Sequence, residues 1–450
     1  MLYWLLKPFV IISLRVYYRV DIKGLKNIPY NKPIIFAPNH SNGFVDPVIL
    51  AKNPKQKVRF FARGDVFKGK FAKWILNQMN TSPMYRMQEG YAEIKKNDKS
   101  FEECRSLLSA DKAILIFPEG QCYSDRRLHP LKKGLSRIAF QTFESFNYSK
   151  DILVIPVGLN FLAPTKFRSK VFIDIGEPIS IKAYEEKYKN DKVRTINDFN
   201  KILEEKLRTY THNINNSESD ALVAHVEEVY THQLLKEKDL DSSKLRNHSA
   251  ASSEIIKIIN HCDIHCPELI SSLKIKMNSY VKLLNNNKLR DHLLREESIS
   301  KMNFWTFIVE YIIVYLGAPI YLVGLLLNYP PYYIAEKFAN KKVKKAEFYA
   351  SFRMNLSLIF WTIYFFIELL IVALIFRNWI LLLVFAVTVV LTGFYVIEFY
   401  PTMKKILGRW RLLRMVRKDR ETVEQIMNER SAIINELNTA KKEYLFFTKD

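Results

Sequence analysis

The residues best suited to chemistry lie in one short segment, Pro38 to Pro47, in which His40 is followed six places later by Asp46. An alcohol is almost fully protonated at neutral pH, so it needs a base to become a nucleophile, and an imidazole pKa of about 6.5 suits that task. A carboxylate that holds one ring nitrogen fixes the tautomer and stabilises the imidazolium. We therefore predict that His40 is a general base and that Asp46 orients it.

The elements around this segment would bring the two side chains together. The apolar run 33–37 predicts a buried strand, Gly43 allows a bend, and the run 47–51 predicts a helix. In an alternative interpretation, His40 and Asp46 are ordinary polar residues of a strand-to-helix turn, with Asp46 near the helix N-terminus. The residues alone leave both interpretations open.

The chain from residue 21 to residue 181 alternates short apolar runs with helical patterns. This alternation predicts an α/β domain with a parallel or mixed sheet flanked by helices, in which the chemistry collects where strands end. The expected strands cover 20–24, 33–37, 58–62, 113–117, 152–159 and 171–175, and the expected helices cover 67–79, 99–109 and 135–146.

Further motifs follow the first in chain order. Arg63 stands after one strand, and the segment Thr81 to Arg86 ends in a second arginine. The segment Ile116 to Gly120, which reads Ile-Phe-Pro-Glu-Gly, closes another strand, and Pro156 lies in the apolar run 154–158. Arginine suits phosphate because its planar guanidinium donates two parallel hydrogen bonds.

Together these motifs resemble the signature of the phospholipid and glycerol acyltransferases, a PlsC-like family. In that family Asn-His is followed by four residues and Asp, whereas five residues separate His40 from Asp46 here. The run Asn42 to Pro47 is similar in wording to the branch that acylates glycerol 3-phosphate or dihydroxyacetone phosphate. A second departure is Cys122, which stands where the family usually carries Ser or Thr, and Ser124 is a candidate substitute.

The resemblance implies transfer of a fatty acyl group from acyl-CoA or acyl carrier protein to the hydroxyl of glycerol 3-phosphate or dihydroxyacetone phosphate, in phospholipid biosynthesis, without a metal or cofactor. It implies that Arg86, Glu119, Gly120 and Arg63 bind the acceptor phosphate and that Pro156 lines the acyl path. For the arginines the alternative is a surface ion pair, and for Pro156 it is a core strand. Lysophosphatidate as acceptor, and a non-catalytic lipid-binding membrane scaffold, are alternative functions.

The composition favours an anionic partner. The chain of 450 residues holds 68 Lys and Arg against 46 Asp and Glu, a formal net charge of +22. Long apolar runs and the lack of a nucleic-acid motif favour an anionic phospholipid membrane over nucleic acid, although a compositional bias is an alternative. The basic residues Arg126, Arg127, Lys132 and Lys133 form a loop that meets either phosphate or solvent.

Two further regions are expected to be helical. Residues 1–20 predict an interfacial or membrane-anchoring helix, with Trp4, Tyr17 and Tyr18 at the head-group level. Residues 182–301 predict a helical extension of the catalytic domain 21–181. The extension contains His261, Cys262, His265 and Cys266, and we favour half-buried helix positions over a metal site because four ligands within six residues cannot readily surround one tetrahedral ion.

The region 302–403 predicts a membrane domain. A transmembrane hairpin covers 356–400, and basic clusters at both outer ends place them in the cytoplasm. The run 304–327 is predicted to be a re-entrant hairpin that returns near Gly317 to Pro319, because a third span would carry the catalytic domain out of the cytoplasm. With a charged, helical cytoplasmic tail at 404–450, we expect a multi-pass protein of the cell membrane whose catalytic domain faces the cytoplasm.

Overall fold

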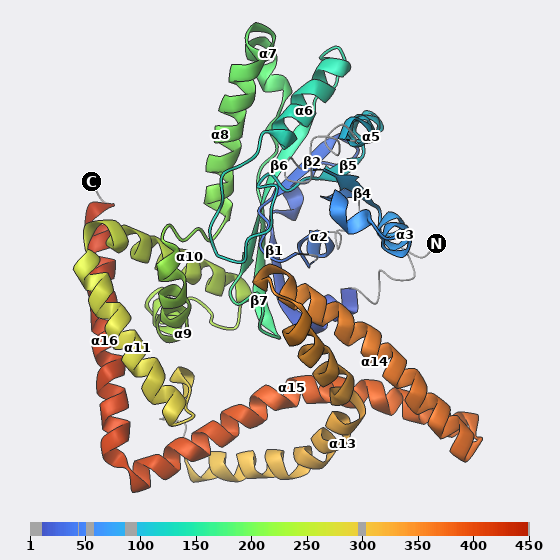
Figure 1. Ribbon diagram of the computed structural model, residues 1–450. Coiled ribbons are helices and arrows are strands. Elements are labelled where there is room, and N and C mark those ends of the chain that lie inside the picture. The colour runs from blue at the N-terminus through green and yellow to red at the C-terminus, as the bar shows by residue number, and fades with distance from the viewer. Residues whose placement is uncertain (1–10, 44, 51–57, 86–96, 296–302, 449–450) are drawn as a thin grey trace. The chain divides into compact units, whose positions relative to one another are not determined.

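The computed structural model of the protein describes residues 11–43, 45–50, 58–85, 97–295 and 303–448. The chain forms two compact units (Figure 1). The first, here called the sheet unit, comprises Met1–Asn213 and Lys345–Ser351. The second, here called the helical unit, comprises Ile214–Lys344 and Phe352–Asp450.

One mixed sheet of eight strands organises the sheet unit, in the order β1-β7-β6-β2-β5-β3-β4, with β8 paired to β6. The central strand β2 is parallel to both β5 and β6, whereas β6 is antiparallel to β7 and β8. The predicted fold class, a mixed sheet flanked and followed by helices, is confirmed, and all six predicted strands are present. The strands are β1 (Tyr18–Lys23), β2 (Ile34–Pro38), β3 (Val58–Arg63), β4 (Thr81–Met84), β5 (Ala113–Leu115), β6 (Leu153–Phe161), β7 (Ser169–Ile175) and β8 (Ile179–Ser180).

Helices cover the sheet because its central strands are apolar on both faces. Every residue of β2 is buried, and Ile35 and Ala37 share a core with residues such as Phe140 of α6, Leu108 of α5 and Leu203 of α8. The helices of this unit are α2 (Val45–Leu50), α3 (Lys70–Gln78), α5 (Asn97–Ser109), α6 (Gly134–Ser145), α7 (Glu185–Asn190) and α8 (Lys192–Tyr210).

The N-terminal segment differs from the expectation of a helix to residue 20. Residues 11–17 are helical, but the chain enters β1 at Tyr18. Tyr17 and Tyr18 are buried rather than at a head-group level, because Tyr18 donates to the Pro164 carbonyl at 2.8 Å and its ring lies 5.6 Å from that of Phe161. Trp4 lies outside the described residues.

Four helices of the helical unit share one core: α9 (Asp220–Glu237), α10 (Leu245–His265), α11 (Pro267–Asn286) and α16 (Arg420–Phe447). The two compact units group these segments differently from the boundaries expected at 182 and 404. Helices α7 and α8 belong to the sheet unit, and α16 packs into the bundle through Ile426, Ile433 and Leu437, which recur at helical spacing and are fully buried. His261 and His265 lie beside Phe447 of α16, and the described residues contain no group of three or more potential metal ligands.

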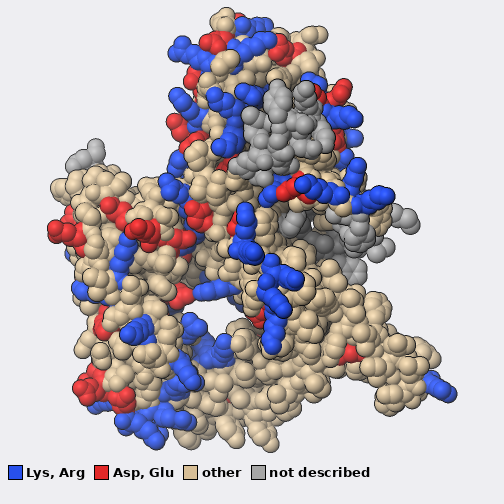
Figure 2. All heavy atoms as spheres, in the orientation of Figure 1, with Lys and Arg blue, Asp and Glu red and all other residues tan. Residues whose placement is uncertain are grey.

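Three long helices follow: α13 (Phe304–Lys342), α14 (Ala346–Phe376) and α15 (Trp379–Lys418). All three are long and apolar enough to cross a membrane, so this is a membrane protein by its helices. Figure 2 shows that the surface over the α14–α15 hairpin, at the lower right, is almost free of charged side chains.

The return predicted near Gly317 to Pro319 is wrong, because α13 is helical throughout. The glycines serve helix packing instead. A Cβ on Gly317 would lie 2.5 Å from the Tyr395 hydroxyl, and one on Gly324 would lie 2.7 Å from the Thr392 carbonyl oxygen. Small residues that let two helices approach closely are typical of membrane bundles, which also tolerate proline within a helix.

Candidate active site

The predicted site residues follow strands that end at one edge of the sheet. Phe36 of β2 lies level with Leu115 of β5, and Leu115 lies level with Phe60 of β3. His40, Glu119 and Arg63 come three or four residues after these positions. Parallel register therefore carries all three to the carboxyl edge, where sites in such folds form.

The structure brings His40 and Asp46 together. The imidazole Nδ1 lies 2.9 Å from the Asp46 Oδ2, and the Asp46 carboxylate is fully buried. The same Oδ2 accepts hydrogen bonds from the backbone N–H groups of Ser41 and Asn42, at 2.9 and 2.8 Å. An ionised carboxylate only accepts, so a neutral imidazole beside it holds its proton on Nδ1 and leaves the Nε2 lone pair free. The Asp46 side chain reaches back to the loop, so the interpretation of a simple helix-capping residue is not needed.

The five-residue spacing is closed by a sharp turn. The Val45 N–H donates to the Asn42 carbonyl at 2.8 Å, and Gly43 has φ +31°. A Cβ on Gly43 would lie 2.8 Å from the ring of Phe348 in the first turn of α14, so only glycine fits without a shift. The Gly43 N–H donates to the Cys122 Sγ at 3.2 Å, and burial and the nearby Asp46 raise the pKa of the Cys122 thiol.

Glu119 is buried beneath the His40 loop rather than exposed to an acceptor. Its Oε1 accepts from the His40 N–H at 2.8 Å, and its Oε2 accepts from the His129 N–H at 3.1 Å. Burial raises the pKa of Glu119 to about 8, against the lowering effect of these two donors. Its predicted role in binding the acceptor phosphate stays a prediction. In the structure both carboxyl oxygens hold backbone N–H groups, an arrangement that sequence reasoning missed because spacing does not reveal burial. Gly120 has φ +70° and turns the chain after Glu119.

Two arginines were predicted to bind the acceptor phosphate, and the structure describes one of them. Arg63 stands at the expected edge, but its Nε donates to the Asp65 Oδ1 at 3.0 Å, so it is held in the local ion pair that was the alternative interpretation. Arg86 lies outside the described residues.

Pro156 lies inside the sheet, opposite Ala37 of β2, and is buried. It falls between the residues of β6 that pair with β8, ending at Val154, and those that pair with β7, starting at Val157. A missing N–H therefore costs no ladder hydrogen bond there. This position fits the core strand that was the alternative to an acyl path.

A second imidazole–carboxylate pair lies next to the first. His129 Nε2 is 3.0 Å from Asp125 Oδ1, and the His129 ring stacks on Tyr123 with centroids 3.6 Å apart. Because the Tyr123 N–H donates to the His40 carbonyl and Glu119 joins the backbones of both histidines, the two pairs share one scaffold. The four-residue spacing from Asp125 to His129 was the available sequence signal.

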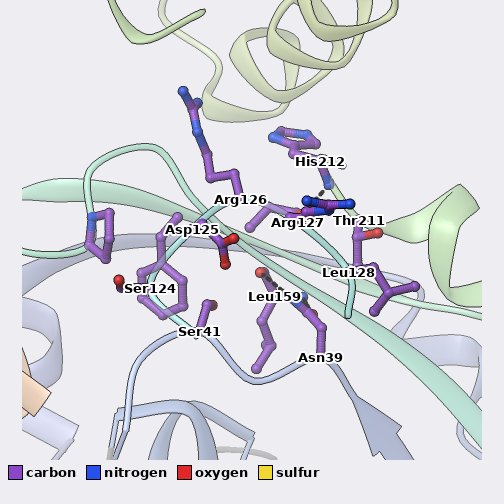
Figure 3. Close-up of a pocket in the computed structure, with 13 residues that line it drawn as sticks. Asn39, Ser41, Ser124, Asp125, Arg126, Arg127, Leu128, Leu159, Thr211 and His212 are labelled. Atoms are coloured by element: carbon purple, nitrogen blue, oxygen red, sulfur yellow. Dashed lines mark hydrogen bonds between the residues drawn. The ribbon is translucent and has the colours of Figure 1, made fainter. Parts of the chain in front are cut away.

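A pocket of about 360 Å³, including space open to solvent, lies against the residues on either side of His40 rather than against its imidazole (Figure 3). Asn39 and Ser41 form one side and the loop 124–128 forms another. Arg127 is exposed and has no ion-pair partner among the described residues. Burial, with a smaller effect of Arg126, lowers the pKa of His212 to about 3 and keeps its imidazole neutral.

The fold and this edge define the class of domain. Residues 19–160 match the family model described as Acyltransferase, and this segment therefore belongs to that family.

The similar proteins carry two different names, glycerol-3-phosphate O-acyltransferase and 1-acyl-sn-glycerol-3-phosphate acyltransferase. Glycerol-3-phosphate O-acyltransferase 2 of Saccharomyces cerevisiae is 26% identical over 262 residues, covering 57% of this chain and 34% of the relative. A chloroplastic 1-acyl-sn-glycerol-3-phosphate acyltransferase of Brassica napus is 28% identical over 141 residues, covering 31% of this chain and 39% of the relative. The chain thus matches only about a third of the length of these relatives. The crystal structure of the Thermotoga maritima acyltransferase PlsC is 20% identical and covers 46% of this chain and 79% of its own, with a TM-score of 0.33.

Proposed function

We propose that this protein is a membrane-bound O-acyltransferase of glycerolipid synthesis, which moves a fatty acyl group from acyl-CoA or acyl carrier protein to a glycerophosphate hydroxyl. The observation that carries the proposal is the His40 Nδ1 contact with Asp46 Oδ2 at 2.9 Å. The contact orients an imidazole whose other nitrogen is available as a base. The family of residues 19–160 supports the same chemistry.

The reaction follows from the two side chains. His40 Nε2 takes the proton of the acceptor hydroxyl while the hydroxyl oxygen attacks the thioester carbonyl. Asp46 stabilises the imidazolium that forms. The tetrahedral intermediate expels the thiolate, which takes the proton back from His40 to give the thiol and the ester. A thiolate leaves readily because a model thiol has a pKa of about 8.5. No covalent enzyme intermediate is needed.

Glycerol 3-phosphate or dihydroxyacetone phosphate is the proposed acceptor, ahead of lysophosphatidate. The match to the yeast glycerol-3-phosphate acyltransferase extends over 262 residues, well past the family segment 19–160, whereas the match to the Brassica enzyme covers 141 residues. We assign the acceptor phosphate to the arginines predicted to bind it, Arg86 and Arg63, together with Arg127 of the pocket. A phosphate at Arg63 would have to displace its partner Asp65.

The full chain in purified membranes, supplied with a labelled acyl-CoA or acyl carrier protein and each of the three acceptors in turn, tests the proposal. We expect acylation of glycerol 3-phosphate or dihydroxyacetone phosphate, lowered about 10²–10⁴-fold in kcat by His40→Ala. His225→Ala, in α9 of the helical unit, is the matched control and should leave kcat unchanged. Turnover retained by His40→Ala would exclude the general base, and preference for lysophosphatidate would reverse the acceptor assignment.

We further propose that the sheet unit faces the cytoplasm, where soluble acyl donors are present. Lys341, Lys342, Lys344 and Lys345 precede α14, and further basic residues follow the apolar part of α15. By the positive-inside rule, both outer ends of the hairpin are then cytoplasmic.

A further inference from the structure

The number of membrane crossings follows from which parts of the chain pack together. Helices α14 and α15 are joined only by Arg377 and Asn378, so they cross as a pair or not at all. The remaining question is whether α13 crosses as well. If it does, segments before and after it lie on opposite sides of the membrane.

The segment directly after α13 packs against a loop that lies before α13 in the sequence. Residues Lys345–Ser351 belong to the sheet unit, and the Gly43 position lies against them. A Cβ on Gly43 would lie 2.8 Å from the Phe348 ring and 3.0 Å from the Glu347 carbonyl oxygen. A contact this close cannot be made across a bilayer whose hydrocarbon core is about 30 Å thick. The described residues between Gly43 and α13 contain no candidate membrane span, so the chain begins and ends α13 on the same side.

A second set of contacts lies wholly within the helical unit and joins the segment before α13 to the end of α15. A Cβ on Gly408 of α15 would lie 2.8 Å from the Leu293 side chain, and Arg411 donates to the Lys288 carbonyl at 2.7 Å. Helix α16 shares its core with α10 and α11. The segments before α13 and after α15 are therefore on one side, and the total number of crossings is even.

The path of α13 explains how a long apolar helix meets this condition. Its first half runs antiparallel to α15, from the ion pair of Glu310 with Arg409 to Asn328, which donates to the Val389 carbonyl at 3.1 Å in the middle of the apolar part of α15. Its second half runs back beside the start of α14, where Arg353 pairs with Glu336 at 3.1 Å. Figure 1 shows the change of direction between the two halves.

We place the bend at Pro330 and Pro331, because a proline inside a helix kinks it. Proline at 330 has no N–H for the Leu326 carbonyl, and the Tyr364 hydroxyl of α14 donates to that carbonyl at 3.4 Å. Asn328 also accepts from Trp361 Nε1 at 2.9 Å. The Leu326 carbonyl freed by Pro330 is thus satisfied by a neighbouring helix, which backbone at membrane depth requires.

We infer that α13 is a re-entrant helix that enters the membrane, turns at Asn328 to Pro331 and leaves on the side it came from. The exposed surface of α13 is apolar, which suits contact with the acyl chains of one leaflet of the bilayer. Large apolar side chains along its first half are exposed in the chain, among them Trp305, Tyr315 and Leu326. The protein then crosses the membrane twice, through α14 and α15 alone. The inference is independent of the catalytic proposal.

Single cysteines test the crossing number in sealed membrane vesicles of known orientation. The full chain is first freed of its four cysteines, and one is then introduced by Asn286→Cys, Lys344→Cys, Arg377→Cys or Lys418→Cys. We expect an impermeant thiol reagent to label positions 286, 344 and 418 from one side and position 377 only from the other. Labelling of 344 from the side opposite 286 would establish a crossing by α13 and overturn the inference. If the cysteine-free chain does not fold, epitope tags inserted at the same positions of the native chain give the same pattern.

Spin labels measure depth and separate a re-entrant helix from one that lies flat. Trp305 and Leu326 are matched, with exposed fractions of 73% and 71%. A label at Trp305→Cys should lie near the head groups, and one at Leu326→Cys should lie markedly deeper, with greater access to oxygen and less to a polar relaxant. Equal, shallow depths would overturn the re-entrant path.

Discussion

Replacing Glu119 by Gln tests whether this carboxyl positions His40 or binds the acceptor. The carboxyl accepts the N–H groups of His40 and His129, at 2.8 and 3.1 Å. Glutamine keeps one acceptor oxygen, so one buried N–H loses its partner, at a cost of about 1–3 kcal/mol. The unpaired N–H group displaces the loop that carries His40. If restoring the loop in the transition state costs this free energy, kcat falls about 5–150-fold.

The same variant changes the pH dependence of stability. Burial raises the Glu119 pKa to about 8, above its ordinary value of 4.5, so between these values the folded state binds a proton that the unfolded state releases. Stability of the native chain therefore falls as pH rises from about 4.5 to about 8, by at most about 1.4 kcal/mol per pH unit from this group. Glutamine does not titrate, so the stability difference between native chain and variant should shrink over this window.

Two measurements on the detergent-solubilised full chain check this reasoning: steady-state kinetics with varied acceptor, and thermal unfolding from pH 5 to pH 8. A positioning role lowers kcat and leaves the acceptor KM unchanged, whereas direct binding of the acceptor would raise KM. A raised acceptor KM with unchanged kcat would refute the role assigned to Glu119. A stability difference that is constant with pH would refute its raised pKa.

Three other substitutions probe separate contacts. Asp46→Asn should lower kcat about 10²–10⁴-fold while the protein stays folded, because the amide can no longer fix the His40 tautomer; unchanged kcat would contradict the pair. Gly43→Ala should destabilise the fold by about 1–3 kcal/mol, measured by thermal unfolding, because its φ is positive and a Cβ meets the Phe348 ring. Asn328→Leu should destabilise the membrane bundle by about 1–2 kcal/mol in a detergent unfolding titration, because Trp361 and two carbonyls lose their partner; an unchanged midpoint would argue against the bend.

The sequence predicted the strands and the His40–Asp46 pair well because both depend on local signals. Alternating apolar runs define strands. A histidine and an aspartate on either side of a glycine turn come together regardless of which helix packs against the turn. Side-chain direction is another matter. Glu119 was expected to face the acceptor, yet it turns beneath the His40 loop because its partners, the N–H groups of residues 40 and 129, are distant in sequence.

Packing between distant helices was also beyond the sequence. The apolar stripe of α16 fits a solvent-facing tail as well as a bundle until α10 and α11 are placed beside it. The breakers in α13 show the same limit. Gly317 and Pro319 were expected to turn the chain, whereas α13 stays helical through both and Gly317 lies against Tyr395 and Phe399 of α15.

The two departures from the family pattern, the extra residue before Asp46 and Cys122 in place of a hydroxyl, meet at a single contact. The loop between His40 and Asp46 is one residue longer than in the family pattern, and within this loop the Gly43 N–H donates to the Cys122 sulfur at 3.2 Å. Sulfur is larger than oxygen and forms its hydrogen bonds at longer distance, so it suits a loop that is one residue wider. The pair itself is held by other contacts, because Asp46 Oδ2 accepts from the backbone N–H groups of Ser41 and Asn42. The spacing change thus alters the support of the loop and leaves the geometry of the base intact.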